Sequence, residues 1–317
     1  MNKRLTYTNI FLLVMLGLYL FANLYVSVVI MVYPDMPQQV VWMNTATYLI
    51  GFGLPCVVYA FILKNSFRQP LRETFSFRKL PFSTVLLSIL LGLLIQPVNS
   101  LIAQLASLVF QDITSLSVTS MTGMPLLYLI FAMAVLPAVF EEILCRGVLF
   151  DGHKDAPVWY QLVIPGVFFG LLHMNFQQIS YALPMGIFLG YVLYITGSIY
   201  STMIIHFVMN GSQVTIAWLY ENLGWFDGST LFDKIFLTCM GSSDLLWVNA
   251  CAAGVAAALI VLILLALRKI HCHRQKPPRI LRPGWHKGAY IMYIILGLFF
   301  LLALLMEAAI PLLQPYM

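Results

Sequence analysis

The sequence predicts an all-α fold, a polytopic bundle of about eight to nine transmembrane helices. Hydrophobic residues make up 61% of the chain and charged residues only 9%, whereas soluble domains carry about 25% charged residues. Apolar stretches of about 20 residues, the length that spans a bilayer, recur along the whole chain. With so few charged residues, the chain lacks the polar surface that a water-soluble protein requires. We find no alternation of apolar and polar residues in segments of about ten, the pattern of a transmembrane barrel, so the predicted spans are helices.

Nine apolar segments follow one another along the chain. The first comes after Lys3 and Arg4 and is longer than the apolar core of a signal peptide, which has about 7–15 residues, so we interpret it as a retained helix. No internal repeat or soluble domain separates the segments, so we predict a single integral membrane domain over residues 1–317. The segments lie at 10–33, 40–63, 82–110, 124–150, 157–176, 179–196, 199–220, 246–268 and 288–310.

Lysine and arginine gather in the loops that we expect on one side of the membrane. They cluster at 3–4, 64–79 and 268–287, whereas the loop at 221–245 is mainly acidic. The positive-inside rule places basic loops in the cytoplasm, and nine spans then put the N-terminus in the cytoplasm. We therefore expect a multi-pass protein of the cell (plasma) membrane. The net charge of +5 follows from this topology, and it does not indicate nucleic acid as a partner.

Charged residues gather at the end of the fourth apolar segment, where each costs about 2.5–3.5 kcal/mol to insert. Glu142 and Arg146 are four residues apart, so they share a helix face and can form an ion pair. Glu141 points about 100° away around the helix and has no partner on its own turn. An interfacial ion pair with a snorkelling arginine would explain Glu142 and Arg146, but not the second glutamate. We therefore predict that Glu141 is available for chemistry.

Two later apolar segments each carry a histidine. Phe169 precedes His173 by one helical turn late in the fifth segment, and His206 precedes Asn210 by one turn in the seventh. A single histidine in a spanning helix commonly bonds to a neighbouring helix. Two histidines together with Asn210 and Glu141 are explained more economically as one site.

The depth of His173 in the membrane is a test of that shared site. If its helix begins near Pro157, His173 lies much deeper than Glu141 at a rise of about 1.5 Å per residue. Proline inside a helix kinks or breaks it. We therefore expect the inserting helix to begin at Pro165, which brings His173 to the level of Glu141.

These side chains form an apt set for hydrolysis. The Glu141 carboxylate can take a proton from water, one of the two histidines, His173 or His206, can share that task, and histidine and asparagine donors such as Asn210 can stabilise an oxyanion. Glu141, His173 and His206 are also suitable ligands for a divalent metal such as Zn²⁺. No serine or cysteine nucleophile has a comparable setting, so the residues favour activated water over a covalent intermediate.

Three motifs carry a resemblance to a known family. Glu141-Glu142-xxx-Arg146, Phe169-xxx-His173 and His206-xxx-Asn210 resemble, in this order, the motifs of the CPBP family. That family includes the type II CaaX prenyl endopeptidases and the Abi, or bacteriocin-processing, proteins. The resemblance covers roughly residues 120–220, which we interpret as the catalytic core. Cys145 stands where the first motif commonly has an aromatic residue.

The resemblance implies an intramembrane (metallo)endopeptidase that hydrolyses a peptide bond. It implies that Glu141 and His173 activate water, that His206 with Asn210 assists the oxyanion, and that Glu142, Arg146 and Phe169 support the site. A divalent metal, Zn²⁺ if one is used, would bind Glu141, His173 and His206. The expected partners are membrane lipids and a peptide or lipidated protein tail as substrate.

Two other classes of function are compatible with the sequence. A non-enzymatic scaffold or bacteriocin immunity protein would keep the fold and bind a partner, although it would retain the motif residues only by accident. A proton-coupled transporter would use Glu141 and the histidines as a relay, but transporters of this kind are commonly built from repeated halves. Loss of cleavage in a Glu141 variant would favour the peptidase over both.

Overall fold

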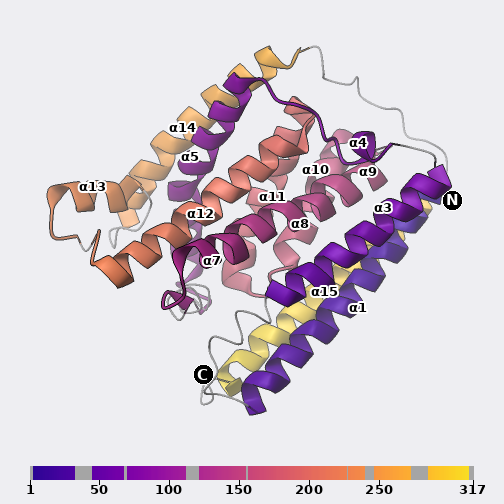
Figure 1. The fold of residues 1–317 in the computed structure, drawn as a ribbon, viewed down its shortest axis with the longest axis horizontal. Coiled ribbons are helices and arrows are strands. Elements are labelled where there is room, and N and C mark those ends of the chain that lie inside the picture. The colour runs from indigo at the N-terminus through magenta and orange to yellow at the C-terminus, as the bar shows by residue number, and fades with distance from the viewer. Residues whose placement is uncertain are drawn as a thin grey trace. The chain divides into compact units, whose positions relative to one another are not determined.

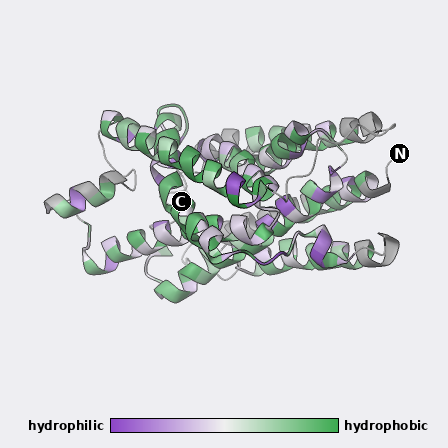
Figure 2. Ribbon diagram, turned by 90° about the horizontal axis from the view of Figure 1, so that it is seen from above, coloured by the Kyte–Doolittle hydropathy of each residue, from purple (hydrophilic) through white to green (hydrophobic). Residues whose placement is uncertain are grey.

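The computed structural model describes residues 3–32, 45–67, 70–111, 121–154, 156–226, 228–239, 246–272 and 285–313. All regular elements in these ranges are helices, and each predicted apolar segment overlaps one or more of them (Figure 1). The predicted all-α fold is therefore confirmed. Figure 2 shows that hydrophobic residues predominate along the helices, as expected for segments that lie in lipid. Helices suit this environment because they satisfy their backbone hydrogen bonds internally.

Three of the described helical elements are π-helical, and two of them, η2 and η3, flank the segment that carries Glu141 and Glu142. The three are η1, η2 and η3, and such segments are often found at functional sites. The elements in chain order are α1 (Lys3–Val32), η1 (Thr47–Gly53), α3 (Leu54–Phe67), α4 (Leu71–Thr74), α5 (Phe82–Ala106), α7 (Leu126–Ile130), η2 (Phe131–Val135), α8 (Leu136–Glu142), η3 (Ile143–Leu149), α9 (Phe150–Gly152), α10 (Val158–Leu171), α11 (Phe176–Thr196), α12 (Ile199–Leu223), α13 (Leu231–Cys239), α14 (Leu246–Ile270) and α15 (Trp285–Leu313).

Within the described ranges, four helices are long and apolar enough to cross a membrane: Phe82–Ala106, Leu126–Gly152, Phe176–Thr196 and Leu246–Ile270. Shorter apolar helices lie at Leu5–Tyr19, Tyr48–Ile62, Val158–Leu171 and Ile291–Leu305. Large apolar side chains are exposed along many of these helices, and such surfaces require a lipid covering. These features indicate an integral membrane protein. Helix α12 carries polar residues along its length and is not among the four.

The chain divides into two compact units. The first comprises Met1–Phe77, Phe140–Tyr191 and Lys276–Met317, and the second comprises Arg78–Val139 and Val192–Gln275. In the first unit, α15 packs against α1 and α10, and η3 packs against α10. The rings of Phe168 and Phe299 meet edge to face with centroids 5.0 Å apart. The first unit thus joins N-terminal, central and C-terminal helices around one apolar core.

Glycines allow α10 and α11 to approach closely in the first unit. A Cβ atom on Gly186 would lie 2.8 Å from the Cα of Gly166, and one on Gly170 would lie 2.8 Å from the Cβ of Leu183. Helix α10 runs from Val158 to Leu171 with Pro165 inside it. The prediction that the helix begins at Pro165 is therefore wrong, because the helix begins seven residues earlier and continues through the proline. On this helix, Gly166 and Gly170 allow close packing against α11.

Polar side chains connect the helices of the second unit. The Gln96 amide on α5 donates to the Met209 carbonyl of α12 at 2.7 Å, and Gln213 donates to the Gln96 side-chain oxygen at 2.9 Å. On the other side of α5, Asn249 of α14 donates to Gln104 at 2.9 Å. Such bonds join helices in lipid, where no water competes for the polar groups.

His153 lies in the connection that follows the spanning helix Leu126–Gly152 and is fully buried. Its Nδ1 lies 2.8 Å from the carbonyl oxygen of Leu149. A carbonyl can only accept, so Nδ1 carries the proton. The ring also lies 5.4 Å from that of Tyr160. Burial lowers the pKa of His153 from 6.5 to about 4, since desolvation disfavours the charged imidazolium.

We expect acid to destabilise the protein through His153. The unfolded chain binds a proton near pH 6.5 and the folded chain resists it until about pH 4. Stability is therefore fully present above pH 6.5 and declines as the pH falls toward 4, by up to about 3 kcal/mol. Thermal unfolding in detergent, measured between pH 7.5 and 4.5, should show a smaller decline for His153→Asn than for the wild type. Equal declines would contradict this account.

Candidate active site

Glu141 and Glu142 end helix α8, at the junction with the π-helical turn η3. They lie within the continuous apolar helix Leu126–Gly152, whose surroundings are too apolar for a carboxylate to be solvated. Glu142 is completely buried and Glu141 is 5% exposed. Two adjacent carboxylates at this depth require partners from the protein.

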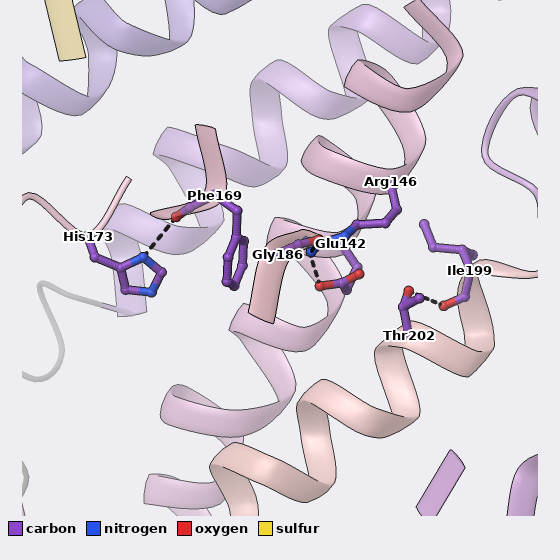
Figure 3. Close-up of polar contacts among 7 residues, drawn as sticks. All are labelled: Glu142, Arg146, Phe169, His173, Gly186, Ile199 and Thr202. Carbon is purple, nitrogen blue, oxygen red and sulfur yellow. Dashed lines mark hydrogen bonds and ion pairs between the residues drawn. The ribbon is translucent and has the colours of Figure 1, made fainter. Parts of the chain in front are cut away.

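Arg146 is the partner of Glu142. Its Nη1 donates to Glu142 Oε1 at 3.0 Å, and both side chains have no exposed surface. The predicted ion pair is therefore confirmed. The Nη2 atom of Arg146 donates to the Gly186 carbonyl of α11 at 2.8 Å, and its guanidinium lies 4.7 Å from the centre of the Phe169 ring. Figure 3 shows Arg146 between Glu142, Gly186 and Phe169. Arg146 thus connects η3 to α11 and α10.

His173 lies just beyond the end of α10, in a turn rather than in the helix. Its position late in a helix was predicted wrongly, because α10 ends at Leu171. The Nδ1 atom of His173 nevertheless lies 2.9 Å from the Phe169 carbonyl, and the two rings meet edge to face at 5.2 Å (Figure 3). Because the carbonyl accepts, Nδ1 carries the proton and Nε2 carries the lone pair. The half-buried imidazole is thereby oriented with a basic nitrogen opposite its anchor.

Two tyrosines that the sequence analysis did not identify contact this region. The Tyr48 hydroxyl of η1 donates to Glu141 Oε1 at 2.8 Å, so the partner of Glu141 comes from another helix. The Tyr19 hydroxyl of α1 donates to the Leu172 carbonyl at 2.7 Å, next to His173. Both tyrosines lie inside predicted apolar segments, 10–33 and 40–63, and no periodic pattern in the sequence marks either one as the partner of a distant residue.

The contacts form two continuous routes from the glutamates to the His173 turn, both within the first unit. One passes from Glu142 through Arg146 and Phe169 to His173. The other passes from Glu141 through the hydroxyl and ring of Tyr48, which stacks on Phe52 at 5.3 Å. Phe52 in turn meets Tyr19 at 6.0 Å, and Tyr19 bonds to Leu172. A carboxylate and an oriented imidazole held in one packed framework can serve acid–base chemistry.

The other two predicted site residues, His206 and Asn210, lie on α12 in the second unit. His206 is 2% exposed. The Asn210 amide donates to the Met133 carbonyl of η2 at 3.1 Å, and η2 belongs to the same continuous helix that continues to Glu141. Near the start of α12, the Thr202 hydroxyl donates to the Ile199 carbonyl at 2.9 Å (Figure 3).

The donor chemistry of Glu141, His173 and His206 suits zinc. Over the residues that the structure describes, no group of three or more His, Cys, Asp or Glu side chains lies together as a metal cluster. The three candidate ligands are divided between the two units. We therefore derive no step through a metal.

Comparison with known proteins gives one match. Residues 123–212 match the model of the Rce1-like family, type II CAAX prenyl endopeptidase Rce1-like. The match spans all three motifs and supports the CAAX protease family that the motifs predict. No curated protein and no solved structure matches the chain.

Proposed function

With the CAAX protease family supported by residues 123–212, we propose that this protein is an intramembrane endopeptidase. It hydrolyses a peptide bond with water activated by Glu141 and His173. The observation that carries the proposal is the packed framework that joins both residues. Glu141 is held by Tyr48 at 2.8 Å, and His173 is held by Phe169 at 2.9 Å with its basic Nε2 opposite the anchor.

The proposed chemistry is a general-base hydrolysis. The Glu141 carboxylate takes a proton from water, and the water oxygen forms a bond to the substrate carbonyl carbon. His173, through Nε2, accepts a hydrogen bond from the same water. The tetrahedral intermediate then expels the amine, which receives the proton, and the products are a carboxylate and an amine. His206 and Asn210 are proposed to stabilise the oxyanion.

Glu142, Arg146 and Phe169 are proposed to hold this site in shape. Their contacts join η3 to α10 and α11. The buried ion pair engages Glu142, and Glu141 is the carboxylate that we propose takes the proton.

If the protein uses a metal, Glu141, His173 and His206 are the residues that would hold Zn²⁺, and the zinc would lower the pKa of a bound water. Dialysis of the purified protein against a chelator separates the two cases. Activity lost on dialysis and restored by stoichiometric zinc would assign a metal. Activity that survives would assign water activated by the side chains alone.

The substrate is proposed to be a peptide or lipidated protein tail that reaches the site from the lipid phase. Its peptide end would lie between helices, and an attached prenyl chain would lie against the apolar surfaces that lipid also covers. The experiment compares cleavage of a farnesylated reporter and the same peptide without the lipid. Cleavage of the first alone indicates a prenyl peptidase, cleavage of both indicates a broader peptidase, and cleavage of neither by an active, folded preparation opposes the proposal.

We also propose that the protein lies in the plasma membrane with a cytoplasmic N-terminus, and the basic loops at 64–79 and 268–287 support this orientation. Labelling of single cysteines introduced into these loops, in intact cells and in inverted vesicles, tests the orientation. Labelling only in inverted vesicles is expected, and labelling in intact cells would reverse the topology.

We expect His173→Gln to lower kcat/KM at least about 100-fold, because it removes the basic Nε2 nitrogen. The rate of reporter cleavage measures this loss. The matched control is His271→Gln, which alters a buried histidine that contacts Thr84 at 2.8 Å in the second unit. Similar losses in both variants would indicate a general structural effect and contradict the proposed role of His173.

A further inference from the structure

The proposed peptidase site receives a contact from outside the segment that matches the family. The Tyr48 hydroxyl lies on η1, upstream of residues 123–212, and donates to Glu141 Oε1 at 2.8 Å. A hydrogen bond to a carboxylate is charge-assisted, so it is stronger than one between neutral groups. The N-terminal helices therefore contact the residue on which the proposed chemistry depends.

The structure around Tyr48 holds its ring in place. Its ring stacks on Phe52 with centroids 5.3 Å apart and a tilt of 24°. A Cβ atom on Gly53 would lie 3.0 Å from the Phe140 ring, so this glycine lets η1 pack closely against α8 beside Glu141. Aromatic packing on one side and the close helix approach on the other restrict where the Tyr48 hydroxyl can point.

We propose that Tyr48 is a positioning residue for Glu141. It fixes the direction of the carboxylate, because it donates a hydrogen bond to Oε1 from a ring that packs on Phe52. The inference rests on the proposed function, since the carboxylate must point toward the water whose proton it takes. It also makes η1 a required part of the peptidase site.

Other ionisable groups near Glu141 are accounted for in this proposal. On its own helix, Glu142 pairs with Arg146, and the fully buried Cys145 lies within electrostatic range of both glutamates. On α1, Tyr19 lies within electrostatic range of Tyr48 and bonds to Leu172.

The test is the rate at which dicyclohexylcarbodiimide, an apolar reagent that modifies carboxyl groups in apolar surroundings, labels Glu141 at one fixed pH. Labelled peptides are quantified by mass spectrometry in wild-type protein, Tyr48→Phe and Tyr59→Phe. Tyr59 is a matched control, because its buried hydroxyl lies 2.8 Å from Thr8. Loss of the Tyr48 bond releases the carboxyl group to react and should raise the labelling rate about tenfold, while Tyr59→Phe should follow the wild type.

The same three proteins are assayed for reporter cleavage. Tyr48→Phe should lower kcat about tenfold with KM nearly unchanged, because the carboxylate is no longer held toward the water, and Tyr59→Phe should match the wild type. An unchanged labelling rate and an unchanged kcat in Tyr48→Phe would overturn the positioning role. Faster labelling in Tyr48→Phe, together with a wild type that cleaves nothing, would instead retain the positioning role and overturn the proposed function.

Discussion

Glu141→Gln is expected to lower kcat/KM for peptide cleavage by about 100- to 10,000-fold. The substitution removes the proposed general base, and groups of this kind contribute about that factor. It preserves the volume of the side chain, and the amide oxygen can still accept the hydrogen bond that Tyr48 donates to Oε1 in the wild type. The thermal unfolding temperature in detergent should therefore stay close to that of the wild type.

Glu141→Asp is the companion variant. It keeps the carboxylate but withdraws it by one methylene from the position that Tyr48 and the helix fix, so an intermediate loss of rate is expected. The measurement is the initial rate with the farnesylated reporter. Full activity in Glu141→Gln would show that this carboxylate is not the base.

Arg146→Met is expected to destabilise the folded protein by about 3–5 kcal/mol. It leaves the Glu142 carboxylate buried without the cation that lies 3.0 Å away, and it removes the bond to the Gly186 carbonyl. Chemical or thermal unfolding in detergent measures the change. Lys154→Met is the matched control, because the Lys154–Asp151 pair has a longer separation of 3.4 Å and a partly exposed lysine, and such pairs contribute about 0–1 kcal/mol.

Removing both members of the buried pair separates charge from packing. Glu142→Gln combined with Arg146→Met leaves no buried charge, and apolar or neutral replacement of a whole pair is often close to neutral. The double variant should therefore be more stable than Arg146→Met alone. If Arg146→Met loses no more stability than Lys154→Met, the ion pair does not hold η3, α10 and α11 together.

The parts of the structure that follow from local rules were predictable from the sequence. Apolar length predicted the helices, because a bilayer requires backbone groups to be satisfied within each segment. The pairing of Glu142 with Arg146 was predictable because residues four apart on a helix are neighbours.

The end of α10 was not predictable from the same rules. Helices commonly end in a glycine that adopts the left-handed conformation, but Met174 adopts it here, with φ of 53°. Because no glycine marks this point, the pattern from Phe169 to His173 read as continuous helix. His173 still contacts the residue four positions earlier, because its side chain bonds to the Phe169 carbonyl after the helix has ended.

Contacts between distant segments were also beyond reach of the sequence. The bond from Tyr48 to Glu141 joins residues 93 positions apart, and that from Arg146 to Gly186 joins residues 40 apart. Neither has a periodic pattern, because each depends on how separate helices pack. The sequence predicted a helix start at Pro165, but α10 runs through this proline. The close packing of Gly166 and Gly170 against α11 is a contact between separate helices, which the sequence pattern does not show.

The most direct test of a shared Glu141–His173 site is a double-variant measurement of kcat/KM on the farnesylated reporter. Four proteins are compared: the wild type, Glu141→Gln, His173→Gln and the combination, at enzyme concentrations that make residual rates measurable. If both residues activate one water, the wild type cleaves the reporter, each single variant is severely slowed, and the double variant is no slower than the slower single one. The account would be contradicted if the loss of kcat/KM in the double variant equalled the product of the two single losses. It would also be contradicted if the wild type did not cleave the reporter.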